Sequence, residues 1–108
     1  MKLITEKINN FSMINISGRI DSTNYAEFEN HINQLFNNGE MNIILNCQGL
    51  KYISSSGLRV FLMAQKKAAA VNGKLHLCGL QPSIKEIFVI SGFSTIFDIS
   101  ETVQEALQ

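Results

Sequence analysis

Three consecutive hydroxyl side chains and a glycine separate an apolar segment from a segment with helical spacing. They are Ser54, Ser55, Ser56 and Gly57. A helix start leaves backbone N–H groups without intrahelical partners and carries the positive end of the helix dipole, so a phosphate is favoured there. A serine at this position could therefore act as a reversible charge switch. Spacing alone favours the simpler interpretation that Ser54 or Ser55 caps the helix with its hydroxyl.

Short strands alternate with amphipathic helices around this junction. Two β-favouring segments, residues 3–8 and 11–17, are separated by Asn9-Asn10, which suits a tight hairpin turn. The apolar run at residues 41–45 predicts a buried strand covered on both faces, and residues 47–51 are expected to form the loop after it. The remaining predicted strands are residues 74–78 and 95–98.

Two helices are predicted from apolar side chains at helical spacing. The first has an apolar face made of Tyr25, Phe28, Ile32, Leu35 and Phe36. Asp21 or Ser22 can cap its start, and Asn37-Asn38-Gly39 ends it. The second follows the serines, with an inner face of Leu58, Phe61, Leu62, Gln65, Ala68 and Ala69 and an outer face of Arg59, Met63 and Lys66. It stops at Asn72-Gly73, where left-handed geometry is readily accepted.

Two further helices complete the predicted α/β fold. Pro82 opens the third helix and Gly92 closes it, while Ser100 with Glu101 starts the fourth. Strands that alternate with helices imply a largely parallel sheet with right-handed crossovers, and the opening hairpin adds an antiparallel pair. We therefore predict one domain over residues 1–108, with a mixed, mostly parallel sheet and about four helices.

The charge balance and the cysteine content argue against several classes of protein. Nine basic and nine acidic residues give a formal net charge of zero, which removes the electrostatic reason to expect nucleic-acid or anionic-membrane binding. Cys47 and Cys78 lie in or beside apolar segments and are expected to be buried thiols in a reducing compartment. The N-terminus lacks the features of a signal peptide, and no segment is apolar enough to span a membrane, so we expect a cytoplasmic protein.

The sequence offers no constellation for metal, cofactor or catalytic chemistry. His31 and His76 have no neighbouring ligand at metal-binding spacing. The serine junction carries neither a Gly-x-Ser-x-Gly elbow nor a Ser-x-x-Lys pair, and no glycine-rich phosphate motif occurs. We therefore expect no enzyme activity, no metal, no cofactor and no small-molecule substrate.

The residues from Asn46 to Leu58 resemble the signature of the STAS domains, in particular those of the bacterial anti-sigma factor antagonists. Gly18-Arg19-Ile20-Asp21 is similar to the turn after the second strand of that family, and the resemblance extends over the whole chain. The predicted order of strands and helices also matches the family's fold. That topology would place Asp21 close to the serine junction, where it could contact a partner, and capping of the first helix is the equally weighted alternative.

This resemblance implies a phosphorylation switch. In the family, a serine or threonine at the start of this helix is phosphorylated by the anti-sigma factor, which is also a kinase, and it corresponds to Ser55. Ser54 and Ser56 are alternative acceptors because they are adjacent. Many family members carry an acidic residue immediately before the acceptor and an aspartate at the end of the preceding strand, where this chain has Ser54 and Asn46.

The implied function is that of an anti-sigma factor antagonist. The unphosphorylated chain would bind an anti-sigma factor serine kinase and free a sigma factor, phosphorylation would end the binding, and a serine phosphatase is a further candidate partner. The expected partner contacts are Asp21, Ser54, Ser56, Gly57, Leu58, Arg59, Met63 and Lys66. Arg59 and Lys66 could meet an acidic partner or simply form a solvated face. The alternative function is a non-phosphorylated STAS subunit that scaffolds a stress-signalling or membrane transport complex.

Overall fold

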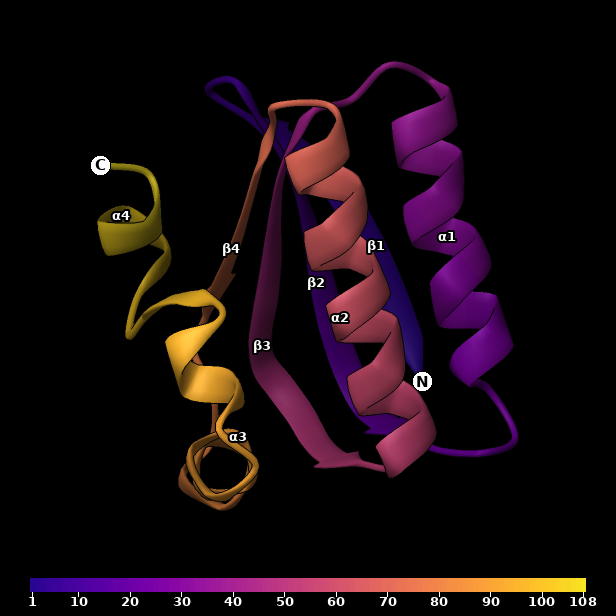
Figure 1. The fold of residues 1–108 in the computed structure, drawn as a ribbon, viewed down its shortest axis with the longest axis vertical. Helices are drawn as coiled ribbons and strands as arrows, with labels where there is room; N and C mark the ends of the chain where they lie inside the picture. Colours follow the sequence, from indigo (N-terminus) through magenta and orange to yellow (C-terminus); the bar gives the residue numbers. More distant parts are fainter.

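Five strands form one mixed sheet in which the spatial order follows the chain order (Figure 1). The computed structural model describes all 108 residues. The strands are β1 (Lys2–Ile8), β2 (Phe11–Ile20), β3 (Asn42–Ile53), β4 (Lys74–Cys78) and β5 (Asp98–Ser100). β1 pairs with β2 in antiparallel orientation, and all the other neighbouring pairs are parallel. The predicted α/β fold, with an antiparallel hairpin ahead of a parallel sheet, is confirmed.

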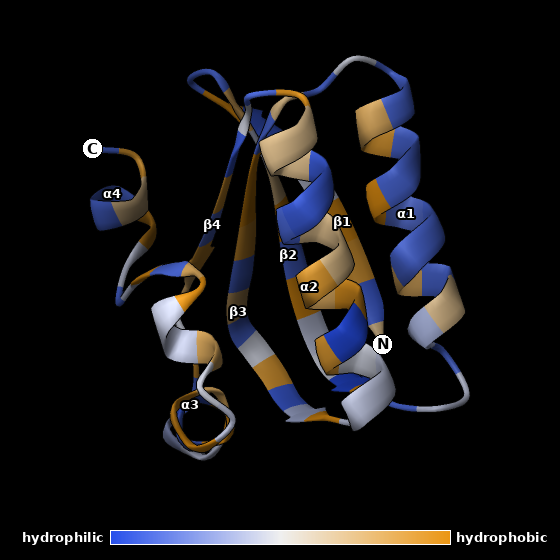
Figure 2. Ribbon diagram, in the orientation of Figure 1, coloured by the Kyte–Doolittle hydropathy of each residue, from blue (hydrophilic) through white to orange (hydrophobic).

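Three helices cover one face of the sheet, and a short fourth helix lies against the other face (Figure 1). They are α1 (Tyr25–Asn37), α2 (Ser55–Ala70) and α3 (Pro82–Ile90) on the first face, and α4 (Val103–Ala106) on the second. Strand side chains alternate between the two faces, so Ile14 packs in the core under the three helices while Met13 packs with α4. Figure 2 shows the apolar residues on the strands and along the helices that cover them. No helix combines enough length with enough apolar character to span a membrane.

The larger core joins the sheet to α1, α2 and α3. Phe28, Phe61 and Phe88 contribute one fully buried ring from each of these helices. The ring centroid of Phe61 lies 5.5 Å from that of Phe28 and 5.6 Å from that of Phe88. Tilted and edge-on contacts at this spacing are favourable for aromatic pairs. Because Phe61 contacts both neighbours, α2 is held between the other two helices.

β2 and β3 are longer than their local patterns indicate. The sequence predicts an end at Ser17 for β2 and a loop at residues 47–51. Both predictions are wrong, because the two strands run on together to Ile20 and Ile53, with two register shifts on the way. A Cβ on Gly49 would lie 2.8 Å from the Ser17 Cβ, so the missing side chain lets the two backbones stay close enough to pair.

α2 turns a different face to the core from the one its spacing predicts. Its buried residues are Gly57, Val60, Phe61, Ala64 and Ala68. Of the predicted inner face, Phe61 and Ala68 are buried, whereas Leu58, Leu62 and Gln65 are half-buried and Ala69 is exposed. The start of the helix accounts for this rotation, because Gly57 packs directly against the ends of β2 and β3. The predicted end of the helix near Asn72-Gly73 is confirmed.

The last strand is displaced from its predicted position. β5 begins at Asp98, the residue at which the sequence predicts that it ends. The preceding residues, Phe93–Thr95, form a 3₁₀ turn, and Phe97 is buried in the core instead of lying in a strand. By contrast, α3 begins at Pro82 as predicted, and Gly92 follows its end.

The cap of the last helix also differs from the prediction. The sequence predicts a start at Ser100 with Glu101, but the N-cap is Thr102, whose hydroxyl accepts a hydrogen bond from the Glu105 N–H at 3.2 Å. Ser100 lies in β5, and its hydroxyl is hydrogen-bonded to His76 Nε2 at 2.8 Å. Pairing of β5 with β4 therefore draws Ser100 into the sheet and delays the helix by two residues.

Candidate functional site at the start of α2

The site lies where two neighbouring parallel strands end together. Ile20 and Ile53 are register partners, so the residues that follow them, Asp21 and Ser54, are neighbours at the same edge of the sheet. The Ser54 N–H donates to the Ile20 carbonyl at 2.9 Å, which ties the start of α2 to the end of β2. The prediction that Asp21 lies near the serine junction is therefore confirmed.

The three serines have different surroundings. Ser54 is the N-cap of α2, and its hydroxyl accepts a hydrogen bond from the Gly57 N–H at 3.2 Å. The Ser54 carbonyl accepts the bond from the Leu58 N–H at 3.0 Å. Ser55 is the first helical residue and is exposed, whereas Ser56 is half-buried. The capping interpretation is therefore correct for Ser54 and wrong for Ser55, whose side chain lies at the surface.

Gly57 is buried at the closest approach of α2 to the sheet. A Cβ on it would lie 2.8 Å from both Ile20 Cγ2 and Ile53 Cγ1, closer than side chains normally pack. The two isoleucines thus fill the space that a glycine at this position leaves open. The missing side chain serves the internal packing of the helix start, and a partner contact by Gly57 stays a prediction.

Asp21 shapes the turn before α1 without capping that helix. Its Oδ1 accepts hydrogen bonds from the Thr23 hydroxyl at 2.6 Å and from the Thr23 N–H at 2.9 Å. These two bonds, the hydroxyl first, lower the pKa of the Asp21 carboxyl. The N-cap of α1 is Asn24, so the predicted cap at Asp21 or Ser22 is wrong. The chain makes one additional turn first, in which the Asp21 carbonyl accepts from the N–H of Tyr25 at 3.0 Å.

Arg19 and Tyr52 stand beside this turn, and sequence reasoning missed both. They are register partners on β2 and β3, and the Arg19 guanidinium carbon lies 4.2 Å from the centroid of the Tyr52 ring. Arg19 Nε also lies 4.0 Å from Asp21 Oδ2. A cation over a ring face is attracted by the ring's quadrupole, so Arg19 links the ring to the turn. The strand register is the signal that would have revealed this pair, and no local spacing contains it.

Four of the predicted contact residues lie on α2 after Gly57. Arg59 and Lys66 are exposed, while Leu58 and Met63 are half-buried and also pack against the larger core. Leu58 and Arg59 directly follow Gly57 and so lie close to the serine junction. Lys66 lies about 16 Å further along the helix axis than Ser55, at the usual rise per residue.

The two thiols lie inside the protein, as predicted. Cys47 and Cys78 are buried and form no disulfide. Burial raises the pKa of both thiols, that of Cys78 to about 11. Both therefore stay protonated at neutral pH, which is typical of structural cysteines rather than nucleophiles. No group of three or more His, Cys, Asp or Glu side chains is arranged to hold a metal ion.

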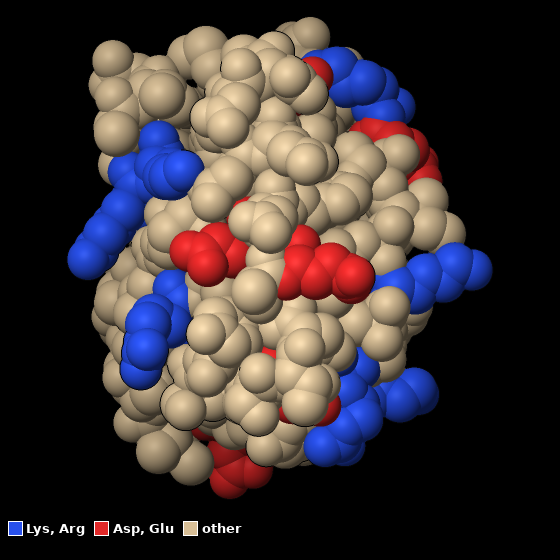
Figure 3. All heavy atoms as spheres, turned by 90° about the vertical axis from the view of Figure 1, so that its right-hand side faces the viewer, with Lys and Arg blue, Asp and Glu red and all other residues tan.

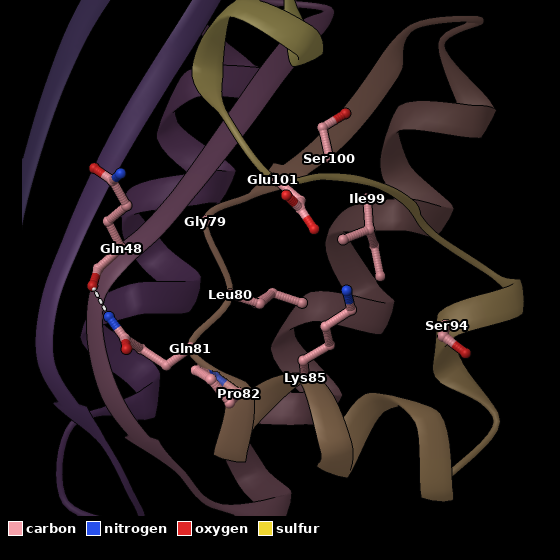
Figure 4. Close-up of a pocket in the computed structure, with 10 residues that line it drawn as sticks. All are labelled: Gln48, Gly79, Leu80, Gln81, Pro82, Lys85, Ser94, Ile99, Ser100 and Glu101. Atoms are coloured by element: carbon pink, nitrogen blue, oxygen red, sulfur yellow. Dashed lines mark hydrogen bonds between the residues drawn. The ribbon is translucent and has the colours of Figure 1, made fainter.

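A polar cavity of about 700 Å³ opens beside the start of α3, at the same edge of the sheet as the serine junction (Figure 4). Gln81 lines the cavity and donates a hydrogen bond to the Gln48 carbonyl at 2.6 Å. Lys85 and Glu101 also line the cavity and are exposed. None of the residues that the sequence predicts for the site lines this cavity.

The whole chain resembles proteins described as anti-sigma factor antagonists. A protein of Bordetella bronchiseptica named as the anti-sigma factor antagonist BtrV is 37% identical over 106 residues, which cover 98% of this chain and 91% of that protein. A solved structure from Thermotoga maritima, described as an anti-sigma factor antagonist, has a TM-score of 0.91 at 17% identity, over 97% of this chain and 91% of that one. The phosphorylated form of the Bacillus protein SpoIIAA has a TM-score of 0.77 at 23% identity, over 98% and 96% of the two chains.

The two solved structures share the fold described above. The chain also matches the model of the STAS domain family over residues 2–106, which include the whole sheet and all four helices. This match contains both the signature from Asn46 to Leu58 and the turn that ends at Asp21. The chain therefore belongs to the STAS domain family.

Proposed function

We propose that this protein is an anti-sigma factor antagonist, which binds an anti-sigma factor in its unphosphorylated form and so frees a sigma factor. The name of its relative BtrV, 37% identical over nearly all of both chains, supports the antagonist function. The observation that carries the switch is the exposed side chain of Ser55 on a helix whose cap is already supplied by Ser54. The anti-sigma factor is proposed to be the serine kinase that modifies Ser55.

Ser55 is the best placed acceptor among the three serines. A kinase must align the attacking hydroxyl with the nucleotide phosphate, and an exposed side chain meets this requirement most easily. Ser54 is half-buried and uses its hydroxyl as the helix cap, and Ser56 is half-buried as well. Modification of Ser54 would disturb a cap that stabilises a helix by roughly 0.5–2 kcal/mol relative to alanine.

A phosphate on Ser55 would be accepted by the fold and rejected by the partner. It carries about −1.5 to −2 charges at neutral pH, and the helix dipole favours a charge at this end by roughly 0.3–1 kcal/mol. Arg59 follows four residues later on the same face of α2 and can pair with the phosphate. A partner surface made for a neutral hydroxyl would meet repulsion, a desolvation cost and steric bulk. Modification therefore changes binding without unfolding the protein.

The proposed contact surface is centred on Ser55. Its members are Asp21, Ser54, Ser56, Gly57, Leu58, Arg59, Met63 and Lys66. The turn at Asp21 contributes one side of the surface, and the outer face of α2 contributes the other. Because Gly57 is buried, its part is to keep α2 close to the strand ends and so to hold Ser55 in place.

The test uses the purified protein and the anti-sigma factor kinase encoded in the same genome. The wild type should bind this kinase, and incubation with ATP should place a phosphate on Ser55, located by mass spectrometry. Ser55→Ala should bind and take up no phosphate there. Ser54→Ala and Ser56→Ala are the matched controls, and both should still be modified at Ser55.

Three outcomes would contradict different parts of the proposal. If the protein does not bind the kinase and takes up no phosphate on any of the three serines, the antagonist function is refuted. Binding without any phosphate would refute the switch alone and would favour the scaffold subunit. A phosphate on Ser54 or Ser56 in the wild type would move the acceptor.

A further inference from the structure

The outward face of α2 carries a shallow groove of about 400 Å³. Its lining residues are Arg59, Leu62, Met63, Lys66, Lys67 and Ala70. Steps of three residues and one residue alternate along this set, which is the periodicity of a single helix face. The groove therefore runs along the helix axis, over roughly 16 Å from its first to its last residue.

The floor of the groove is apolar. Leu62 and Met63 are half-buried, because the inner part of each side chain packs against the core and the outer part stays uncovered. Arg59 and Lys66 stand on either side of this pair in the sequence, and both are exposed. The helix thus presents an apolar centre with cations at its border, a pattern suited to a partner with the opposite charge.

No carboxylate of this protein neutralises the groove. The Lys67 ammonium donates to Asn33 Oδ1 on α1, and the two salt bridges of the structure lie elsewhere, on β1 and on the turn after β2. The carboxylates of α1, Glu27 and Glu29, line no part of the groove. Figure 3 looks onto α1 and shows basic side chains along both edges of the view, with acidic side chains between them. A local positive charge therefore exists on a chain whose net charge is zero.

We propose that this groove binds an acidic amphipathic helix of the anti-sigma factor, an inference that rests on the function proposed above. Apolar side chains on one face of that helix would pack on Leu62 and Met63. Aspartate or glutamate side chains flanking that face would meet Arg59 and Lys66. A helix suits this groove because the lining residues repeat once per turn. They therefore form ridges between which the side chains of a second helix can pack.

The proposed phosphorylation site, Ser55, lies beside the end of the groove that begins at Arg59. Arg59 lies one turn after Ser55, so a phosphate on Ser55 adds negative charge where the acidic helix approaches. The phosphate would compete for Arg59 and repel the partner's carboxylates at the same time. Recognition of the acidic helix and its release therefore depend on the same contact.

Charge reversal tests the proposal. A variant with Arg59→Glu and Lys66→Glu should bind the purified anti-sigma factor at least about tenfold more weakly, because each exposed ion pair contributes up to about fivefold and reversal adds repulsion. Binding of the wild type should weaken between about 50 and about 500 mM salt, and this dependence should flatten in the variant. Lys85→Glu makes half of this charge change on α3, outside the groove, and should bind like the wild type.

Carbodiimide cross-linking identifies the occupant of the groove. The reagent activates a carboxylate of the anti-sigma factor, and the Lys66 amine then forms an amide while the carboxylate oxygen leaves on the urea by-product. The cross-linked peptide should come from an acidic, amphipathic helix. A cross-link of Lys66 only to strands or loops without acidic flanks would overturn the proposal.

The outcomes separate this inference from the proposed function. If the wild type binds and the doubly reversed variant binds equally, with the same salt dependence, the groove proposal fails while the antagonist function stands. If the wild type does not bind, the antagonist function fails and the groove proposal fails with it. Tight binding of a DNA duplex that the same variant loses would assign the groove to nucleic acid and overturn the proposal. Circular dichroism of each variant confirms that it is folded, as expected for changes at exposed side chains.

Discussion

The chain leaves the same edge of the sheet at two junctions, from β3 to α2 and from β4 to α3. It enters the helix in a different way at each. In the first, the strand is followed at once by Ser54, which caps α2. In the second, three residues separate the strand from Pro82, and Gln81 occupies the N-cap position without a side-chain capping bond. The Gln81 amide donates instead to the Gln48 carbonyl.

This difference separates the proposed surface switch at the start of α2 from a cavity at the start of α3. The longer connection to α3 leaves the polar cavity of about 700 Å³ (Figure 4), while the connection to α2 is packed tightly by Gly57. The proposed switch requires that the phosphate be added to the surface of a structure that stays in place, so that the partner meets only the added charge and bulk. The packed junction meets this requirement, because Ser55 is exposed on a backbone held from both sides.

A negative charge placed at each junction in turn should give the largest difference between them, measured as the affinity for the anti-sigma factor. Ser55→Asp should weaken binding of the anti-sigma factor about 30-fold or more, roughly 2 kcal/mol or more, because a charge added to an interface made for a hydroxyl must be desolvated when the partner binds. Ser83→Asp, an exposed position in the first turn of α3, should bind like the wild type. Titration calorimetry measures both, and equal losses would show that the interface is not centred on α2.

The stability of the same two variants sharpens this result. A carboxylate in the first turn of a helix is favourable by roughly 0.3–1 kcal/mol, so neither protein should unfold more easily than the wild type. Loss of binding by Ser55→Asp together with a lowered unfolding midpoint would instead attribute the effect to unfolding.

The glycines of the two junctions are required for different physical reasons. Gly57 avoids a clash with buried isoleucines, whereas Gly79 has a φ of 72°, in the left-handed region, and a Cβ on it would also lie 2.6 Å from Cγ of the exposed Gln48 side chain. Gly57→Ala should destabilise by about 1–2 kcal/mol, since overpacking costs more than the gain in helix propensity returns. Gly79→Ala should destabilise by about 1–2 kcal/mol through backbone strain, together with displacement of the exposed Gln48 side chain.

Asparagine distinguishes the two glycines. It accepts left-handed geometry better than alanine does, and the exposed Gln48 side chain must move aside for either Cβ, so Gly79→Asn should be milder than Gly79→Ala. At the packed position the order should reverse, because asparagine is larger than alanine and meets the same isoleucines. Urea unfolding measures the four variants, and the same order at both positions would contradict this explanation.

Removal of the two N-cap side chains should have smaller and unequal effects. Ser54→Ala should lower the free energy of unfolding by roughly 0.5–2 kcal/mol, because the Gly57 N–H loses its acceptor. Gln81→Ala removes an exposed hydrogen bond and should cost about 0.5 kcal/mol, since Pro82 already fixes the first turn of α3. Thermal unfolding followed by circular dichroism gives both values. A loss for Gln81→Ala as large as that for Ser54→Ala would remove the contrast between the junctions.

The local features of both junctions could be predicted from the sequence. Ser54 as a possible cap, Pro82 as the start of α3 and Asn72-Gly73 as the end of α2 depend on chemistry within a few residues. The family signature, which is also local, placed Ser55 at the start of the helix. The order of strands and helices followed from the same kind of information.

The non-local features could not be predicted in this way. β2 and β3 reach Ile20 and Ile53 because each strand supplies the hydrogen-bonding partners of the other, which the pattern of neither segment contains. The rotation of α2 depends on the contact of Gly57 with those strand ends, and Arg19 meets Tyr52 through the register. The cap and the helix start at the site are therefore predictable from the sequence, whereas the layout around them depends on strand pairing.

The smallest expected effect is on the acid dependence of the free energy of unfolding, and it concerns Asp21 in the turn beside the α2 junction. The pKa of Asp21 is lowered because its carboxylate accepts hydrogen bonds from the Thr23 hydroxyl and N–H. The carboxylate therefore stabilises the fold above the unfolded-state pKa of about 4, and this contribution is lost as the pH falls through the lower folded-state pKa. Asp21→Asn keeps an acceptor for Thr23 and cannot titrate. Its free energy of unfolding should fall less than that of the wild type between about pH 5 and about pH 2.

Glu40→Gln is the matched comparison at the opposite end of α1. The hydrogen bond from Lys7 lowers the pKa of Glu40, so this carboxylate also stabilises the fold until acid protonates it. The two sites share no partner, so each single variant should remove its own part of the acid dependence, and the double variant should remove the sum. Urea unfolding at each pH measures these parts. An acid dependence of Asp21→Asn equal to that of the wild type would mean that the Thr23 bonds do not hold the turn, and Asp21 would then lose its fixed place beside Ser55.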